Sequence, residues 1–208
     1  MSNPLKSRRL RILILAGILA IVLAINVRQR FGGSMGKGIS IEGGRAISVR
    51  VETLPQLQTD ERWRNDELGE SGEHMGFIGC TVCATSMALS SQGFRINAGD
   101  LNKKLTESGG YTSSGLLIWA AIEDLTNDEF SVKIVNRPTH AYLDKQLEKG
   151  NPLIAKVLYG GSVFHWVLIS GKEGRGYLIH DPLGSGVAHD AMSEYPDGIF
   201  AVRHLIRN

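Results

Sequence analysis

Cys80 is the residue of this sequence that is best placed for covalent chemistry. It follows Gly79, and the small side chains from Cys80 to Ser91 predict a helix that stops before Gly93. At the first turn of a helix, unpaired backbone N–H groups and the positive end of the helix dipole converge. This environment stabilises a thiolate, which is the attacking form of cysteine. The pattern therefore predicts a nucleophile, with an inert buried cysteine as the alternative.

A histidine and an aspartate are spaced to complete such a site. Two strand-like segments flank a glycine-rich turn centred on Glu173. In an antiparallel hairpin with that centre, His165 faces Asp181, and directly opposed residues share one face of the sheet. The carboxylate can then accept the imidazole N–H, fix its tautomer and stabilise the imidazolium. A slip of one residue would separate the pair, and the nearest alternatives are His180 and Asp190.

A glutamine ahead of the nucleophile can donate to a developing oxyanion, together with the backbone N–H of Cys80. Gln56 and Gln58 both lie in the segment before Trp63. The chemistry of the side chain does not choose between them, and a solvated loop glutamine is the alternative for either.

The elements that must hold these residues are of mixed type. Besides the helix after Cys80, helices are predicted over 100–107, 115–125 and 139–148. Strands are predicted over 131–135, 152–159, 165–170, 176–181 and 198–205, with the last at an edge of the sheet. Helices first and antiparallel strands afterwards predict an α+β fold, with N-terminal helices packed on an antiparallel sheet.

The beginning of the chain predicts export. Basic residues crowd the first eleven positions, and Ile12 to Ile25 is an uninterrupted apolar run. We expect one N-terminal hydrophobic helix over 1–27, as a membrane anchor in preference to a cleaved signal. A glycine-rich linker over 28–50 and one domain over 51–208 follow, outside the cytoplasm in the periplasm or the extracellular space. The net charge of +2 and the lack of a recognition motif argue against nucleic acid as a partner.

An ordered set of motifs resembles the stand-alone branch of the double-glycine leader peptidase-like cysteine peptidases. The motifs are Gln58-x-Asp60-x-x-Trp63, Gly79-Cys80, Thr85-Ser86-Met87-Ala88-Leu89, Gly109-Gly110-Tyr111, His165-Trp166-Val167 and Asp181-Pro182. The resemblance implies a papain-like fold, with Cys80 as nucleophile, His165 as base, Asp181 as orienter and Gln58 as oxyanion donor. It implies a peptide or protein substrate, cleaved at a peptide or isopeptide bond, and no metal or organic cofactor.

The chain departs from the family pattern in two ways. Cys83 stands where a threonine or another small residue is commoner, and 22 positions separate Gln58 from Cys80. The double-glycine specificity therefore does not transfer with the chemistry. The glycine pairs Gly32-Gly33 and Gly43-Gly44 in the linker also raise the possibility of self-cleavage.

Three other functions use the same residues. Cys80 and Cys83 form a Cys-x-x-Cys at a helix start, the arrangement of a thiol–disulfide redox protein. A zinc site could combine these cysteines with His74 or His165. A non-catalytic module could use the same cleft to bind peptides. The complete set of nucleophile, base and orienter favours hydrolysis.

Overall fold

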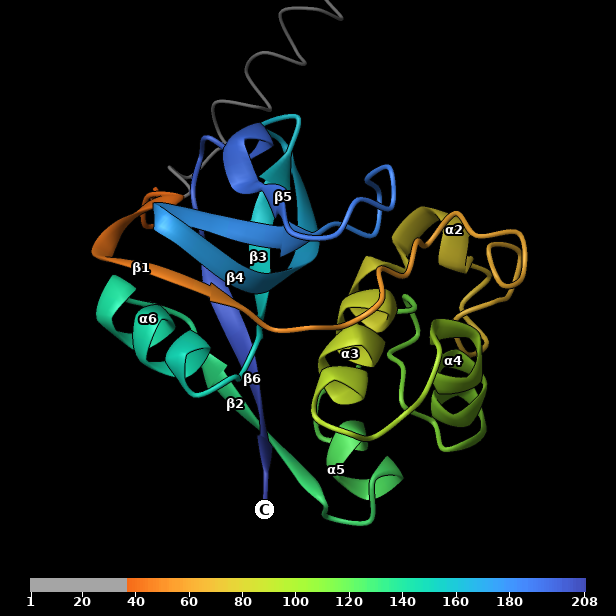
Figure 1. Cartoon of the computed structure of the whole chain (residues 1–208). Coiled ribbons are helices and arrows are strands. Elements are labelled where there is room, and N and C mark those ends of the chain that lie inside the picture. Colours follow the sequence, from red (N-terminus) through yellow and green to blue (C-terminus); the bar gives the residue numbers. More distant parts are fainter. Residues whose placement is uncertain (1–36) are drawn as a thin grey trace, which may run out of the picture. The chain divides into compact units, whose positions relative to one another are not determined.

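The computed structural model describes residues 37–208, which form an antiparallel sheet with helices on both sides (Figure 1). In chain order the elements are β1 (Glu42–Arg50), α2 (Met75–Ile78), α3 (Cys80–Ser91), α4 (Ala98–Glu107), α5 (Ala121–Leu125), β2 (Phe130–Val135), α6 (His140–Glu148), β3 (Leu153–Tyr159), β4 (Val163–His180), β5 (Asp190–Ala191), the 3-10 helix η1 (Met192–Glu194) and β6 (Ala201–Arg207). The α+β prediction is confirmed.

The predicted hydrophobic helix over 1–27 lies outside the described residues, as do linker residues 28–36. From residue 37 onward, no helix has both the length and the apolar character that crossing a bilayer requires.

The strand order of the sheet is β1-β4-β3-β6-β2, and the short β5 pairs with β4. β6 therefore lies inside the sheet, whereas the sequence analysis placed it at an edge. Its Arg203 is opposite Ile134 of β2 on one side and Ile154 of β3 on the other. An interior position suits this strand because its apolar residues Val202 and Leu205 are both buried.

β4 is a single 18-residue strand that doubles back on itself, so that its two ends lie side by side (Figure 1). Near its start, His165 is opposite Val157 of β3, and farther along, Lys172 is opposite Val49 of β1. The reversal brings residue 165 beside residue 181, which is the arrangement that the predicted hairpin requires.

Two hydrophobic clusters lie on opposite faces of the sheet. The first joins α3 and α4 to the face that carries Ile154 and Leu168. Because every residue of α3 from Val82 to Leu89 is buried, its small side chains allow close packing on both the sheet and α4. The second cluster includes Leu143 of α6 and Val167 of β4.

The predicted helix over 115–125 is shorter in the structure, where only Ala121–Leu125 is helical. Gly115 has φ +72°, a left-handed conformation that ends any helix running through it. The residues that follow form a turn, with a bridge between Tyr111 and Leu117. Leu116 is consequently 61% exposed instead of belonging to a buried helix face.

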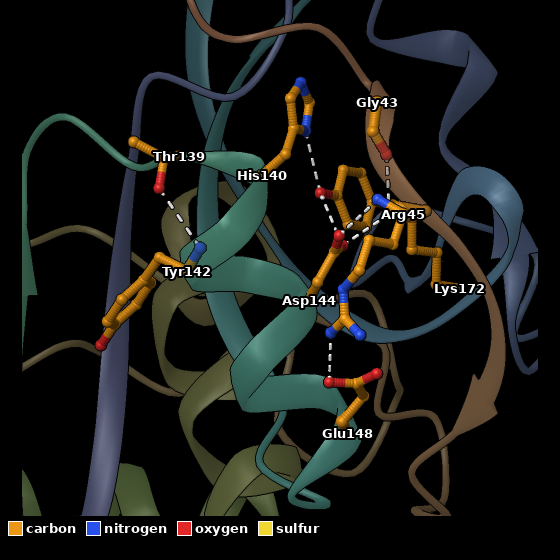
Figure 2. A network of polar contacts seen from close by, with 9 residues as sticks. Gly43, Arg45, Thr139, His140, Tyr142, Asp144, Glu148 and Lys172 are labelled. Carbon is orange, nitrogen blue, oxygen red and sulfur yellow. Dashed lines mark hydrogen bonds and ion pairs between the residues drawn. The ribbon is translucent and has the colours of Figure 1, made fainter.

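β1 occupies residues that the sequence analysis assigned to the linker 28–50. The strand is attached to α6 and β4 by a buried ion pair, in which Lys172 Nζ lies 2.5 Å from Asp144 Oδ1 (Figure 2). Lys172 also donates to the Gly43 carbonyl at 2.7 Å, and the Arg45 N–H donates to Asp144 Oδ2 at 2.8 Å. Both contacts use the backbone of β1, so the strand belongs to the folded domain.

Gly43 and Gly44 are the point of closest approach between β1 and α6. A Cβ atom on Gly43 would overlap the ring of His140, and one on Gly44 would overlap the Asp144 carboxylate. This glycine pair is part of a packed strand and not of a flexible segment open to self-cleavage. Gly32-Gly33 lies outside the described residues.

Candidate active site

The nucleophile candidate begins α3 at a break between two helices. α2 ends at Ile78, Gly79 is the N-cap of α3, and Cys80 is its first residue. A Cβ atom on Gly79 would overlap the carbonyl oxygen of Met75, so a glycine is needed at this position. Cys80 is 8% exposed and its sulfur reaches the surface of a cavity.

Gln58 explains why the two helices do not run on as one. Its Nε2 donates to the carbonyl oxygens of Gly76 at 2.9 Å and Phe77 at 3.2 Å. In a continuous helix these carbonyls would accept the N–H groups of Cys80 and Thr81. Among the described residues, neither of those N–H groups has a backbone acceptor. Two backbone donors are therefore free at the start of α3, beside the thiol.

This arrangement gives Gln58 a different place from the one expected of an oxyanion donor. The side chain is buried next to the nucleophile helix, but both N–H groups of its amide are engaged and it does not line the cavity around Cys80. Its Oε1 is buried without a hydrogen-bond partner in the described part of the chain. Gln56 points elsewhere, since its Oε1 accepts the N–H of Ala98.

His165 and Asp181 are in direct contact, as the spacing predicted. Nε2 of His165 lies 2.7 Å from Oδ1 of Asp181. A carboxylate only accepts hydrogen bonds, so Nε2 carries the proton and Nδ1 is the ring nitrogen left for Cys80. Cys80 and His165 line the same cavity, whose volume is about 420 Å³.

The electrostatics of the pair favour a charged imidazole. Burial opposes the charge of His165, but hydrogen bonds and charge attraction from Asp181 and Cys80 outweigh burial and raise its pKa to about 9. Burial also acts against ionisation of Asp181, yet the hydrogen bond and charge of His165 lower the pKa of this carboxyl below its usual value. The two groups therefore stabilise each other as an imidazolium and a carboxylate.

Tyr195 is a further member of the site that sequence reasoning missed. Its hydroxyl donates to Oδ2 of Asp181, while the N–H of Leu183 donates to Oδ1 at 2.8 Å. Its ring stacks on His165 at a centroid distance of 6.0 Å. Burial, followed by the contact with Asp181, raises the pKa of Tyr195, which keeps the hydroxyl a donor. Tyr195 lies in an irregular segment after η1, and no local pattern marks it in the sequence.

The cavity has an apolar rim formed by both layers of the fold. Large apolar side chains around it are unusually exposed: Phe77 at 81%, Leu116 at 61%, Val163 at 61% and Tyr159 at 51%. Exposed apolar groups that surround a concave site indicate a surface for another molecule. A larger hollow of about 630 Å³ lies between Thr53 and Asp100, but its lining contains no pair of nucleophile and base.

Cys83 does not share the surroundings of Cys80. Both cysteines are free thiols, but Cys83 is fully buried within the first cluster. Burial, with a smaller effect from Cys80, raises the pKa of the Cys83 thiol. A thiol that resists ionisation is a poor partner in thiol–disulfide exchange, which weighs against the redox function. Within residues 37–208, no three His, Cys, Asp or Glu side chains are grouped to hold a metal ion.

Comparison with known proteins shows the family of this chain. A model described as the Peptidase_C39 like family matches residues 50–202, and the chain therefore belongs to that family, which makes it a protein of the cysteine-peptidase kind. No curated protein matches the sequence. A solved structure similar to this chain is the peptidase domain of Streptococcus ComA, a bi-functional ABC transporter involved in a quorum sensing pathway. The two are 16% identical, with a TM-score of 0.47, over 76% of this chain and 99% of that one.

Proposed function

We propose that the protein is a hydrolase that cleaves peptide or isopeptide bonds through Cys80, His165 and Asp181. The observation that carries the proposal is the position of His165, which shares a cavity with the thiol of Cys80 and is hydrogen-bonded to Asp181 through Nε2. This arrangement supports a nucleophile, a base and an orienter in one site.

The chemistry follows from the atoms present. Nδ1 of His165 takes the thiol proton, and the sulfur of Cys80 attacks the substrate carbonyl carbon. His165 then gives this proton to the leaving amine, which departs as the carbon–nitrogen bond breaks and a thioester remains. Water, deprotonated by His165, attacks the thioester and releases the acid. In this proposal the N–H groups of Cys80 and Thr81, which have no backbone acceptor among the described residues, stabilise the oxyanion in both steps.

In this mechanism Gln58 is a positioning residue. It takes no proton and contacts no substrate. Its amide donates to the carbonyls of Gly76 and Phe77, and the N–H groups of Cys80 and Thr81 are therefore left without these acceptors. A direct contact between the Gln58 amide and the oxyanion would require one of these hydrogen bonds to break.

The test is the alkylation of Cys80 by iodoacetamide as a function of pH, in a Cys83→Ser background that removes the second thiol. We expect rapid alkylation at pH 6, and a rate at least tenfold lower at that pH when His165→Ala removes the base. Equal rates with and without His165 would refute the pairing. Reactivity that persists without cleavage of any peptide would favour the binding module.

We further propose that the domain works outside the cytoplasm, tethered by the N-terminal segment. The basic cluster followed by the apolar run from Ile12 to Ile25 supports this proposal. A fusion of alkaline phosphatase to the C-terminus, which is active only when exported, gives the test. An inactive fusion at a normal expression level would contradict it.

A further inference from the structure

Two cationic side chains that are partly withdrawn from solvent have no carboxylate partner in the described part of the chain. In residues 37–208, three cationic side chains are withdrawn from solvent: Lys172 is buried, and Lys156 and Arg203 are partly buried. Lys172 has Asp144 at 2.5 Å. In the same part of the chain, Lys156 and Arg203 have no carboxylate oxygen within 4.0 Å. Partial withdrawal of a cation from water without a counter-charge is unfavourable, so these two positions require an explanation.

The two cations lie on one face of the sheet. Lys156 of β3 is opposite Trp166 of β4, and it is opposite Ala201 of β6 on the other side. Arg203 is two residues beyond Ala201, and side chains two apart on a strand point to the same face. The repulsion between them is evident in Lys156, whose pKa is lowered by burial and by Arg203.

Aromatic rings hold both cations in place. Nζ of Lys156 lies 3.5 Å from the ring centroid of Phe164, and Cζ of Arg203 lies 5.1 Å from Trp166 and 5.4 Å from Trp119. Such contacts attract the cation but do not neutralise its charge. Nε of Arg203 is also buried with no hydrogen-bond partner among the described residues. We call these five residues the cation–aromatic patch.

The patch extends into the candidate active site. Four of its members, Lys156, Phe164, Trp166 and Trp119, line the same cavity as Cys80 and His165. Residues 1–36 contain no Asp or Glu. Because Lys156 lines the cavity, a carboxylate of another molecule that enters the cavity can reach it.

We propose that the cation–aromatic patch is a subsite for a substrate carboxylate, provided either by an Asp or Glu side chain or by a free C-terminus. The inference rests on the proposed peptide hydrolysis and specifies its substrate class. The substrate is a peptide that places bulky apolar side chains on the rim of the cavity and one carboxylate against Lys156. Arg203 does not line the cavity and contributes through its neighbouring positive charge. A charge-assisted hydrogen bond of this kind is worth enough to change the rate about tenfold.

The experiment uses the full chain and a synthetic library of acetylated octapeptides rich in Leu and Phe. Each member is made in a Glu form and a Gln form, and each with a free and an amidated C-terminus. Cleavage is followed by mass spectrometry. We expect carboxylate forms to be cleaved about tenfold faster than their neutral partners. The Glu/Gln arm and the free/amidated arm show which source of carboxylate the subsite uses.

Substitutions test which residues cause the preference for carboxylate peptides. Lys156→Met and Arg203→Met should each bring the ratio of rates toward one, while Lys156→Arg, which keeps the charge, should retain it. Lys133→Met is the matched control, since Lys133 also lies over an aromatic ring, that of Tyr142, but does not line the cavity. Equal cleavage of carboxylate and neutral forms by the unmodified protein would overturn the subsite.

Binding separates this inference from the proposed reaction. The same library is passed over immobilised Cys80→Ala protein, and retained peptides are identified by mass spectrometry. Enrichment of carboxylate forms that Lys156→Met abolishes supports the subsite, even if no peptide is hydrolysed and the proposed function fails. Hydrolysis without any such enrichment leaves the proposed function standing and removes the subsite.

Discussion

His165 holds its proton to a higher pH in the folded protein than in the unfolded chain, because contacts with Asp181 and Cys80 raise its pKa to about 9. An unfolded histidine titrates near 6.5. Protonated His165 therefore stabilises the fold fully below about pH 6.5, and this contribution is lost as the pH rises through about 9.

We expect the difference in unfolding free energy between the unmodified protein and His165→Gln to decrease as the pH rises. The difference should be greatest below pH 6.5, at about 3 kcal/mol, and should disappear above pH 9. Urea unfolding at a series of pH values measures it. Asp181→Asn should flatten the dependence, and a difference that grows with pH would show that the assigned charge state is wrong.

Tyr195 and Tyr159 offer a matched pair of substitutions around the same imidazole. Each ring lies 6.0 Å from His165, but only the hydroxyl of Tyr195 donates to Asp181. Tyr195→Phe should lower kcat about tenfold with little change in KM, because a hydrogen bond to a charged group is lost. Tyr159→Phe should leave kcat within twofold. Steady-state kinetics on a cleaved library peptide decide between these outcomes, and equal losses would exclude an orienting role for the hydroxyl.

Residue types and spacing were sufficient to predict that His165 contacts Asp181 and that Cys80 begins a helix, since helix starts and opposed strand positions follow regular rules. They were insufficient for Tyr195, which reaches Asp181 from an irregular segment 14 residues away. The sequence also did not predict that Lys156 and Arg203 are partly buried. Their burial depends on β6 lying next to β3, a long-range pairing that no local pattern encodes.

The break between α2 and α3 sets the position of Cys80. Gly79→Ala would force a Cβ atom into the carbonyl of Met75, displacing the first turn of α3. We expect alkylation of Cys80 to slow at least tenfold while the far-ultraviolet circular dichroism is unchanged. Gly176→Ala is the control, because its added Cβ would meet only ordinary contacts. Normal alkylation in Gly79→Ala would mean that the helix start tolerates a shift.

The attachment of β1 depends on the buried pair of Lys172 and Asp144. Asp144→Ala leaves Lys172 buried without its partner, and should destabilise the fold by about 3–5 kcal/mol. The double variant Asp144→Ala with Lys172→Met should recover part of this loss. Urea unfolding of the single and double variants gives the comparison, and additive losses in the double variant would contradict the coupling.

Elements with a strong local pattern were predicted well, and those fixed by distant contacts were not. Thr139 caps α6 through the N–H of Tyr142, as the sequence indicated. The glycines of β1 suggested a linker. Their actual role is to allow the close approach of α6 residues about 100 positions away, which the local sequence does not reveal. In segment 115–120, apolar spacing suggested a helix face, but the left-handed Gly115 places these residues on the rim of a cavity.

At the scale of the whole molecule, the folded unit begins near Lys37 and not at Val51. Ile39 already pairs with Ile199, and β1 follows. A chain that starts at Lys37 should unfold at the same urea concentration as the full chain. One that starts at Val51 loses β1 and the Gly43 acceptor of Lys172, and should be markedly less stable. Equal urea midpoints for the two truncated chains would show that the folded domain begins at residue 51.

β4 connects the two hydrophobic clusters of the domain. Its residue Leu168 packs with α3 in the first cluster, whereas Val167, two positions after His165, lies in the second. The strand that carries His165 is therefore fixed on both of its faces. The proposed reaction requires α3, which Cys80 begins, to be docked on this strand, so a chain that lacks this packing holds a thiol without its base.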